Sequence, residues 1–376
     1  MKLDLEQYLR ELEWLINTDS GQGNPEGITA VGDFFADRFS SMGWLVEKYD
    51  LRPDTGNCTV VKNREAERYD VMLIGHVDTV FPAGETAKRP FRRDEKNCYG
   101  VGVIDMKQGC LSMLHILEQL PADVNEKLNI MAIFNPDEEV FSPWSRPILH
   151  RYAAICDKIF VFEAGGGKRV CVQRKGQTAL SVTLHGRAGH AGYMFTNNSL
   201  STVTEAVHWV NTLHQFHSEE ADTTVNVGVF QAGEKRNIVA QTATVEWDIR
   251  YSNLDVKNQV ESAIDELIAH AEALGYQVDV TERRTTPPLV PTQATWDYVE
   301  RMKAVAERTG LPFGLIKRGG LSDANHMAAF GAVCVDSLGP TGDFDHSDRE
   351  YLRIETIEPS TRFAYELICD LAEDKK

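Results

Sequence analysis

The stretch YDVMLIGHVD (residues 69–78) is an apolar run that ends in a histidine and an aspartate. Its apolar residues are continuous rather than alternating, which is typical of a strand covered on both faces of a parallel sheet. Three further runs have the same character: LNIMAIF (128–134), KIFVFE (158–163) and AVCVDSL (332–338). Helical patterns at about 106–120 and 144–155 separate these runs along the chain. The alternation predicts an α/β domain built around a mostly parallel central sheet.

A different pattern occupies residues 177–285. It predicts a strand, a helix, two strands, a helix and a strand, in the segments 177–186, 199–216, 223–231, 241–250, 253–275 and 276–284. Ser199 is the expected start of the first of these helices. This βαββαβ order is that of a ferredoxin-like unit, and the Pro-rich segment TTPPLVP (285–291) marks a boundary. We therefore predict one domain formed by 1–176 and 286–376, with a smaller α+β domain inserted at 177–285.

The composition argues against several classes of partner. The chain has 376 residues and a net charge of −17, so nucleic acid and anionic membrane surfaces would repel it. No apolar run approaches the roughly 20 residues that a membrane-spanning helix needs. Acidic residues interrupt the amino-terminal segment, where Leu5, Leu9, Leu12 and Ile16 instead predict an amphipathic helix. The seven cysteines are dispersed without a CxxC pair, which predicts unpaired thiols and a cytoplasmic location.

Acidic residues and histidines follow each of the four apolar runs. They are His76 and Asp78, the triplet Asp137-Glu138-Glu139, Glu163, and His346. Ligands of open α/β sheets bind beyond the carboxyl ends of the strands, so these side chains are expected to meet at one edge. Residues i and i+2 of an extended segment share a face, which places Asp78 where it can orient the ring of His76. By the same geometry Glu138 and Glu139 would point in different directions, which allows them different partners, whereas Asp137 is expected to be a solvated or turn residue.

The segment YGVGVIDMKQG (99–109) matches a phosphate-binding loop only in part. Asp105 stands where a dinucleotide-binding fingerprint has its third glycine, and its charge would repel a pyrophosphate. Asp105 is then either a metal ligand or a helix N-cap. In the first case, Gly100 and Gly102 would allow the backbone to pass close to the metal site. The histidines and carboxylates collected here suit Zn²⁺, with Co²⁺ or Mn²⁺ as alternatives. Five candidate ligands exceed one tetrahedral site, which favours two metals that share a bridging carboxylate.

Seven motifs occur in one order along the chain: GHVDTV, GVGVIDMKQG, FNPDEEV, GRAGHAG, RNIVAQTATVEWDIRY, GGLSDA and SLGPTGDFDHSDREY. In this order they resemble the co-catalytic dinuclear zinc peptidases, a family that includes carboxypeptidase G, aminoacylase, acetylornithine deacetylase and succinyl-diaminopimelate desuccinylase. The resemblance covers nearly the whole chain and is strongest to the carboxypeptidase G, or glutamate carboxypeptidase, pattern. It implies a phosphorylase/hydrolase-like zinc peptidase catalytic domain, with an inserted domain that serves as a lid and a homodimer interface.

The resemblance also implies a role for each matching residue of the first domain. His76, Asp105 and Glu163 would bind one zinc, and Asp105, Glu139 and His346 would bind the other, with Asp105 bridging. Asp78 would orient His76. Glu138 would be the general base that acts on the water between the metals.

In the inserted domain, the resemblance implies that His190 stabilises the oxyanion of the reaction, from the partner subunit in dimeric members. Asn237 and Arg250 would act as a pair that holds the free carboxylate of the substrate. Two features depart from the family pattern: Gly189 replaces the usual serine, and residues 141–144 are bulkier than expected. These departures leave the pocket shape, and hence the substrate, open.

The expected function is hydrolysis of an amide in a peptide or small molecule with a free carboxylate. The first interpretation is a metallocarboxypeptidase that releases a C-terminal amino acid, with glutamate as the leading candidate. The alternative is an N-acyl-amino-acid deacylase of the aminoacylase or acetylornithine deacetylase type. A remote alternative is a non-catalytic metal-binding relative, which the intact set of ligands and base disfavours.

Overall fold

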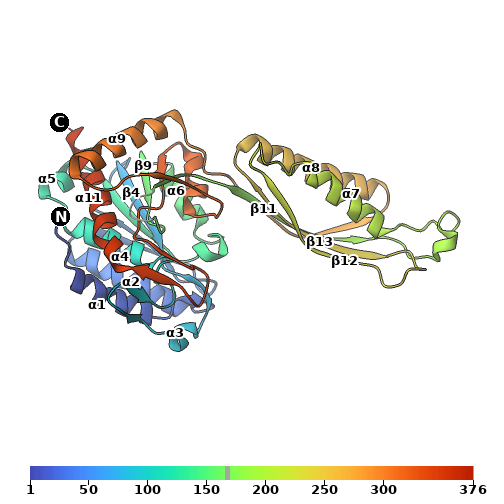
Figure 1. The fold of residues 1–376 in the computed structure, drawn as a ribbon, viewed down its shortest axis with the longest axis horizontal. Helices are drawn as coiled ribbons and strands as arrows, with labels where there is room; N and C mark the ends of the chain where they lie inside the picture. The colour runs from blue at the N-terminus through green and yellow to red at the C-terminus, as the bar shows by residue number, and fades with distance from the viewer. Residues whose placement is uncertain (166–169, 376) are drawn as a thin grey trace. The chain divides into compact units, whose positions relative to one another are not determined.

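The computed structural model describes residues 1–165 and 170–375 and divides into two compact units (Figure 1). One unit comprises Met1–Val172, Pro291–Lys317 and Ser322–Lys376, and the other comprises Gln173–Val290 and Arg318–Leu321. The inserted unit thus begins before the predicted residue 177, ends after 285, and takes up 318–321, which the sequence assigns to the first domain. Backbone pairing explains the difference: Arg174 and Leu289 exchange N–H···O bonds of 3.2 and 3.1 Å, and the Lys175 N–H donates to the Arg318 carbonyl.

A six-stranded sheet lies at the centre of the first unit, in the order β16-β9-β4-β8-β3-β2. These strands span Val333–Val335, Lys158–Val161, Val71–His76, Ile130–Asn135, Asn57–Lys62 and Leu45–Asp50. The first four are mutually parallel, but β3 is antiparallel to β8 and β2 is antiparallel to β3. The sheet is therefore mixed rather than mostly parallel. The prediction missed β2 and β3, an antiparallel pair that needs only a short connection instead of a helical crossover.

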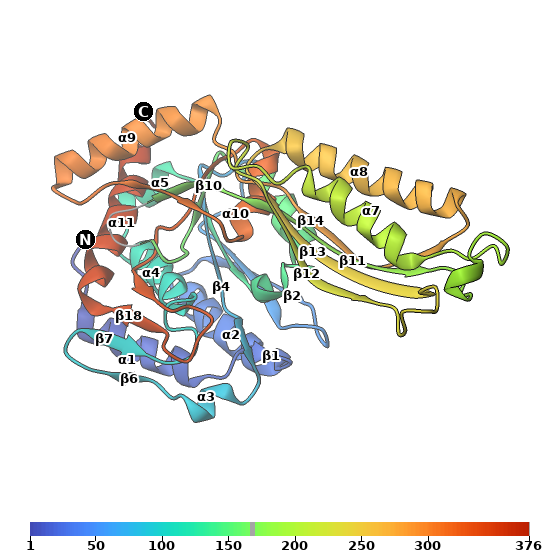
Figure 2. The ribbon, with the colours of Figure 1, turned by 45° about the vertical axis from the view of Figure 1, so that its right-hand side comes forward.

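Helices pack on this sheet through one extended apolar core. The helices that supply residues to this core are α1 (Leu5–Asn17), α2 (Pro25–Ser41), α4 (Lys107–Glu118), α5 (Ala122–Lys127), α9 (Gln293–Thr309) and α11 (Ile357–Glu373) (Figure 2). The unit also contains the helices α3 (Glu85–Lys88), α6 (Arg146–Ala153) and α10 (Asp323–Met327). As its spacing predicts, α1 buries Leu9, Leu12 and Ile16. Within the part of the chain that the structure describes, no helix combines the length and the apolar character needed to cross a membrane.

Short elements complete the chain outside the inserted unit and at its junctions. The strands are β1 (Gly21–Gln22), β5 (Thr79–Pro82), β6 (Arg92–Arg93), β7 (Asn97–Tyr99), β10 (Val170–Arg174), β15 (Leu315–Arg318), β17 (Gly342–Asp343) and β18 (Tyr351–Arg353). The 3-10 turns are η1 (Glu138–Val140), η3 (Ala328–Phe330) and η4 (Ile354–Thr356).

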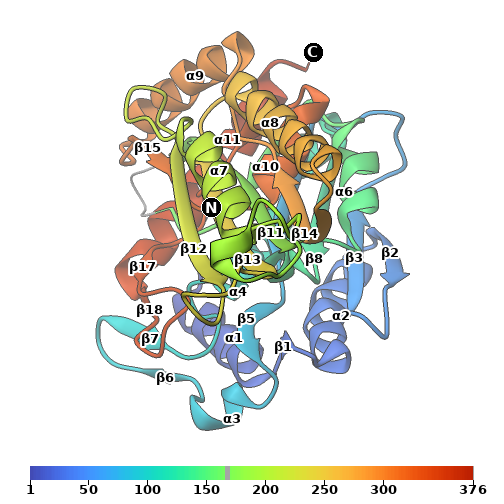
Figure 3. The ribbon, with the colours of Figure 1, turned by 90° about the vertical axis from the view of Figure 1, so that its right-hand side faces the viewer.

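The inserted unit is a four-stranded antiparallel sheet with two helices on one face (Figure 3). Along the chain its elements are β11 (Gly176–His185), η2 (Ala191–Tyr193), α7 (Thr202–His214), β12 (Thr224–Ala232), β13 (Thr242–Tyr251), α8 (Leu254–Ala273) and β14 (Gln277–Thr286). The strand order is β12-β13-β11-β14. Alternate residues of the strands pack with Trp209 of α7 and Ile264 of α8 into a separate core. The first helix starts after Ser201, whose hydroxyl accepts the Thr204 N–H, and not at the predicted Ser199.

Candidate active site

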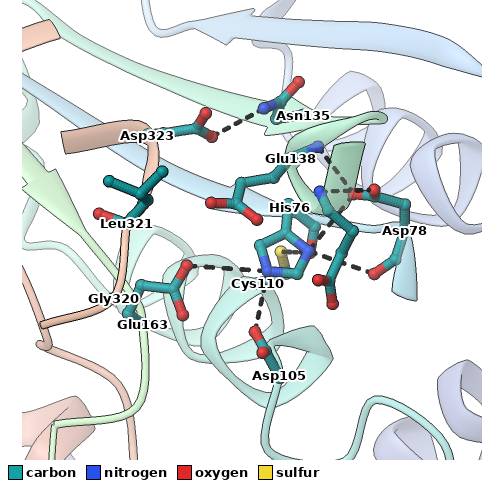
Figure 4. A network of polar contacts seen from close by, with 12 residues as sticks. His76, Asp78, Asp105, Cys110, Asn135, Glu138, Glu163, Gly320, Leu321 and Asp323 are labelled. Carbon is teal, nitrogen blue, oxygen red and sulfur yellow. Dashed lines mark hydrogen bonds and ion pairs between the residues drawn. The ribbon is translucent and has the colours of Figure 1, made fainter. Parts of the chain in front are cut away.

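Three neighbouring parallel strands deliver polar side chains to one edge of the central sheet. His76 is the last residue of β4, Glu163 follows the end of β9, and η1 follows β8. Because β9, β4 and β8 are parallel neighbours, their carboxyl ends share that edge, as expected for ligand sites in α/β sheets. Figure 4 shows the side chains of His76, Glu138 and Glu163 converging there with Asp105, which precedes α4.

Asp105 lies between two imidazoles. Its Oδ1 is 3.0 Å from Nε2 of His76, and its Oδ2 is 3.1 Å from Nε2 of His346. Glu163 adds an oxygen 3.7 Å from Nε2 of His76, and Glu139 adds one 3.4 Å from Nε2 of His346. The five residues that the family resemblance assigns to metal binding therefore form one group, the His–carboxylate cluster. Asp105 is not a helix N-cap, because α4 is preceded by Met106 and has no side-chain cap.

Asp78 contacts both sides of the cluster. Its Oδ1 is 3.3 Å from Nδ1 of His76, which is the contact that the spacing of the two residues predicts. The same carboxylate accepts the backbone N–H of Glu138 at 3.2 Å and that of Glu139 at 3.0 Å. Glu138 and Glu139 accordingly lie in a 3-10 turn and not in the extended segment expected from the sequence. Asp78 thereby fixes the ring of His76 and the start of η1 together.

Asp137 is buried, so the structure excludes the solvated one of its two predicted roles and leaves that of a turn residue. It is 1% exposed, and its Oδ2 accepts the backbone N–H groups of Trp144 at 2.9 Å and Ser145 at 3.2 Å. Asn135, at the end of β8, donates to a carboxylate oxygen of Asp323 at 2.7 Å (Figure 4). These hydrogen bonds hold the loop that follows the carboxylate triplet, so Asp137 stabilises the conformation of that loop.

The Asp105 loop is held by a residue that the sequence did not single out. Glu350 is 3% exposed and accepts the backbone N–H groups of Gly102 at 3.1 Å, Ile104 at 2.8 Å and Asp105 at 3.3 Å. At Gly102, φ is +73° and a Cβ atom would lie 2.6 Å from a methyl carbon of Thr79, which requires glycine. Glu350 also follows His346 by four residues, so one segment carries a cluster histidine and the support of Asp105.

We expect Glu350→Ala to weaken metal binding by about 10–100-fold, as the loss of an outer-shell partner does, because three buried amides lose their acceptor. Glu350→Gln keeps an acceptor oxygen and is expected to restore most of the affinity. The measurement is metal content after equilibration with buffered Zn²⁺, with thermal unfolding of the metal-free proteins as the stability control. Equal metal affinity in all three proteins would contradict the positioning role.

The pKa values within the cluster reflect a surplus of buried carboxylates. Burial raises the pKa of Asp105, but hydrogen bonds from His346 and His76 outweigh it and hold the value below the usual range. Hydrogen bonds to Asp105 and Glu139 raise the pKa of His346 to about 11. Burial, followed by the charge of Asp105, raises the pKa of Glu139 to about 7. Burial, followed by the charges of Glu163 and other carboxylates, raises the pKa of Glu138 well above its usual range.

These pKa shifts indicate a site that attracts positive charge, as a metal-binding site does. Protons and divalent cations compete for the same imidazole and carboxylate lone pairs. The donor set of two histidines and three carboxylates, without a thiolate, suits Zn²⁺ and similar ions. The ligand atoms of His76, Asp105 and Glu139 lie within 4.8 Å of one another. Asp345, which the sequence interpretation overlooked, forms a similar group with Asp105 and His346. The residues therefore fit the cofactor that the resemblance implies.

His190 and Asn237 lie at one end of the inserted sheet. His190 bridges to Ile238, and the Ala191 N–H donates to the Asn237 carbonyl at 3.1 Å. Both segments continue outward from the end of the β11–β13 ladder at which His185 pairs with Thr242.

Arg250 lies at the opposite end of the same ladder, where Gly176 pairs with Tyr251. Its guanidinium donates to both carboxylate oxygens of Asp248, at 3.0 and 3.1 Å, and to the Gly319 carbonyl at 2.9 Å. From Thr242 to Arg250 the extended strand β13 covers roughly 27 Å. Asn237 and Arg250 of one chain therefore lie too far apart to hold one carboxylate together.

A comparison with protein families agrees with this geometry. Residues 72–370 match the model of peptidase family M20/M25/M40. The chain belongs to this family. Its members are metal-dependent hydrolases of amide bonds, so the protein is a metallopeptidase or amidohydrolase.

Among the relatives within the family, carboxypeptidase G2 of Pseudomonas sp. (strain RS-16) is 28% identical over 373 residues, covering 98% of this chain and 90% of the relative. Succinyl-diaminopimelate desuccinylase 1 of Alteromonas mediterranea is 28% identical over 198 residues, covering 47% of this chain and 50% of the relative. The crystal structure of aminopeptidase PepT from Bacillus cereus ATCC 10987 has a TM-score of 0.79 at 20% identity, covering 98% of this chain and 99% of that one. The relatives thus include several activities within one fold.

Proposed function

We propose that the protein is a metallocarboxypeptidase that releases a C-terminal amino acid, with glutamate the first residue to test. The observation that carries the proposal is the His–carboxylate cluster with the carboxyl of Glu138 beside it. In the described residues the Glu138 carboxylate has no hydrogen-bond or ion-pair partner, so it is available to a substrate or a water. The similarity to carboxypeptidase G2 over 98% of the chain favours a carboxypeptidase among the family activities.

We assign two Zn²⁺ ions to the cluster, with Co²⁺ or Mn²⁺ as alternatives. His76, Asp105 and Glu163 would hold one, and Asp105, Glu139 and His346 the other. When bound, such ions lower the pKa of a water and polarise a carbonyl. Asp78 would hold the His76 ring and the η1 turn in fixed positions relative to each other during the reaction.

Glu138 moves the proton in this proposal. It takes a proton from the attacking water and gives it to the nitrogen of the leaving amino acid, so that one residue serves both halves of the hydrolysis. Its raised pKa favours holding that proton between the two steps. The donor for the oxyanion would be His190.

The inserted unit would act as a ferredoxin-like lid and as the interface of a homodimer. Since Asn237 and Arg250 lie at opposite ends of one sheet, we assign them to different chains of each site. One chain would supply the cluster and Arg250, and its partner would supply His190 and Asn237. Arg250 would exchange Asp248 for the substrate carboxylate. The dispersed cysteines of the sequence, which include no CxxC pair, are the basis of the proposed cytoplasmic location.

A substrate panel tests the proposal. The Zn²⁺- or Co²⁺-loaded enzyme is assayed for released amino acid with folyl-glutamate, peptidyl-glutamate, and N-acetyl and N-succinyl amino acids. Faster release from the first two supports the carboxypeptidase. Preference for N-acyl amino acids would contradict it in favour of a deacylase, the alternative that similarity to a desuccinylase keeps open. Metal retention without turnover of any amide would favour a non-catalytic relative.

A further inference from the structure

The inserted unit contains a second group of histidine and carboxylate side chains, separate from the cluster. Glu205 and His208 lie on α7 and His270 lies on α8. One ligand atom from each of the three lies within 4.8 Å of the others. The two imidazole rings have centroids 5.3 Å apart and are inclined by 60°.

The fold brings these residues together from two helices. Glu205 and His208 are three residues apart on α7, so they share one face of that helix. The helices lie side by side over the same face of the sheet (Figures 1 and 3), with Glu205 in the first turn of α7 and His270 in the last turn of α8. The group is therefore set by helix packing and not by a surface loop.

Glu205 is a buried acid that lacks a cationic partner. It is 5% exposed, and one of its oxygens accepts the indole N–H of Trp209 at 3.0 Å. Within residues 1–165 and 170–375, no lysine or arginine pairs with it. A buried carboxylate without a counter-charge is costly. A hydrogen bond such as that from Trp209 is the kind of contact that orients a carboxylate ligand toward a metal.

The two histidines are exposed and available. In the described part of the chain, neither imidazole forms a hydrogen bond or an ion pair. Metal–ligand bonds of about 2.1 Å in a tetrahedral site place the ligand atoms about 3.4 Å apart. The ligand atoms of the three residues now lie within 4.8 Å of one another, so they would have to move closer together. Exposed, unpartnered imidazoles can close that gap by rotating about their side-chain bonds.

We propose that Glu205, His208 and His270 form a binding site for a divalent transition metal ion, zinc in the first instance, which links α7 to α8. Two histidines and one glutamate are a zinc ligand set that leaves the fourth position to water. The site would stabilise the packing of the two helices, and it would hold its metal independently of hydrolysis at the cluster.

The test compares the metal-loaded wild-type enzyme with His208→Ala, His270→Ala and the matched control His214→Ala, an exposed histidine on the same helix. Each protein is titrated with Zn²⁺, desalted, and measured for zinc per chain and for thermal unfolding. The wild type and the control are expected to hold one more zinc per chain than the other two variants, whose affinity for that ion falls at least about 10–100-fold. Added zinc should raise the melting temperature of the wild type and of His214→Ala more than that of His208→Ala and His270→Ala.

Hydrolytic activity reports that each variant is folded, because none of the three histidines belongs to the proposed catalytic machinery. Equal zinc content and equal thermal shifts in all four proteins would overturn the site. Loss of the additional zinc in His214→Ala, with retention in His208→Ala, would also overturn it by moving the metal elsewhere on α7.

Discussion

Replacement of Glu138 by alanine is expected to lower kcat by about 10²–10⁴-fold while the protein keeps its metal, since this is the range of a general acid–base contribution. The geometry separates Glu138 from its neighbour. The side chain of Glu139 accepts the Val80 N–H at 2.9 Å and lies 3.4 Å from Nε2 of His346, as a ligand would. Glu138 shows no such partner in the described residues and has the raised pKa of a proton carrier.

The matched variant is Glu139→Ala, which should lose both metal and turnover. Both variants are measured for zinc by elemental analysis and for kcat with a saturating substrate. Glu138→Gln is the isosteric control, because it keeps the volume of the side chain but cannot accept the proton. A Glu138→Ala enzyme with unchanged turnover would remove this residue from the proposed mechanism, and loss of metal from that variant would make it a ligand.

The part of the site that sequence reasoning can predict is the part encoded locally. The apolar runs place His76, Glu138 and Glu163 after buried strands, and parallel strands bring their ends together. The i and i+2 spacing in the HVD motif places Asp78 against the His76 ring, because only two backbone steps separate them. Such relations depend on strand geometry, which one stretch of sequence determines.

Contacts between distant segments are not encoded in this way. The bonds from Glu350 to the Asp105 loop join residues about 250 positions apart along the chain, and no local pattern marks them. The extended geometry predicted for Glu138 gave way to a 3-10 turn because Asp78 accepts two successive N–H groups there. The edge pair β2 and β3 was overlooked because exposed positions interrupt the apolar pattern of β2.

The placement of Asn237 depends on the register of a ten-residue ladder, and it leads to the second large expected effect. Two weakly active variants, His190→Ala and Arg250→Ala, should regain about a quarter of the wild-type activity when the chains of the proposed dimer are mixed in equal amounts and exchanged, with substrate well below KM. Half of the dimers are then heterodimers. In each heterodimer one site joins an intact Arg250 to an intact partner His190, and the other site lacks both.

Each variant alone is expected to be weak for its own reason. Loss of an oxyanion donor costs about 10²–10³-fold in kcat. Loss of a charge-assisted carboxylate contact costs about 1.5–3 kcal/mol of binding, which should appear in KM. The distinct signatures in kcat and KM verify that each substitution acts as intended before mixing. Activity is followed during chain exchange, with a mixture of His190→Ala and Asn237→Ala as the control.

The control mixture should stay as weak as its two components, because His190 and Asn237 would reach a site from the same partner chain. A heterodimer of these two variants then has one defect in each site. Recovery in both mixtures would place Asn237 with Arg250 on one chain of each site and contradict the assignment drawn from the ladder. A sizing measurement that finds only monomers, with full activity in the wild type, would require His190 to act within its own chain.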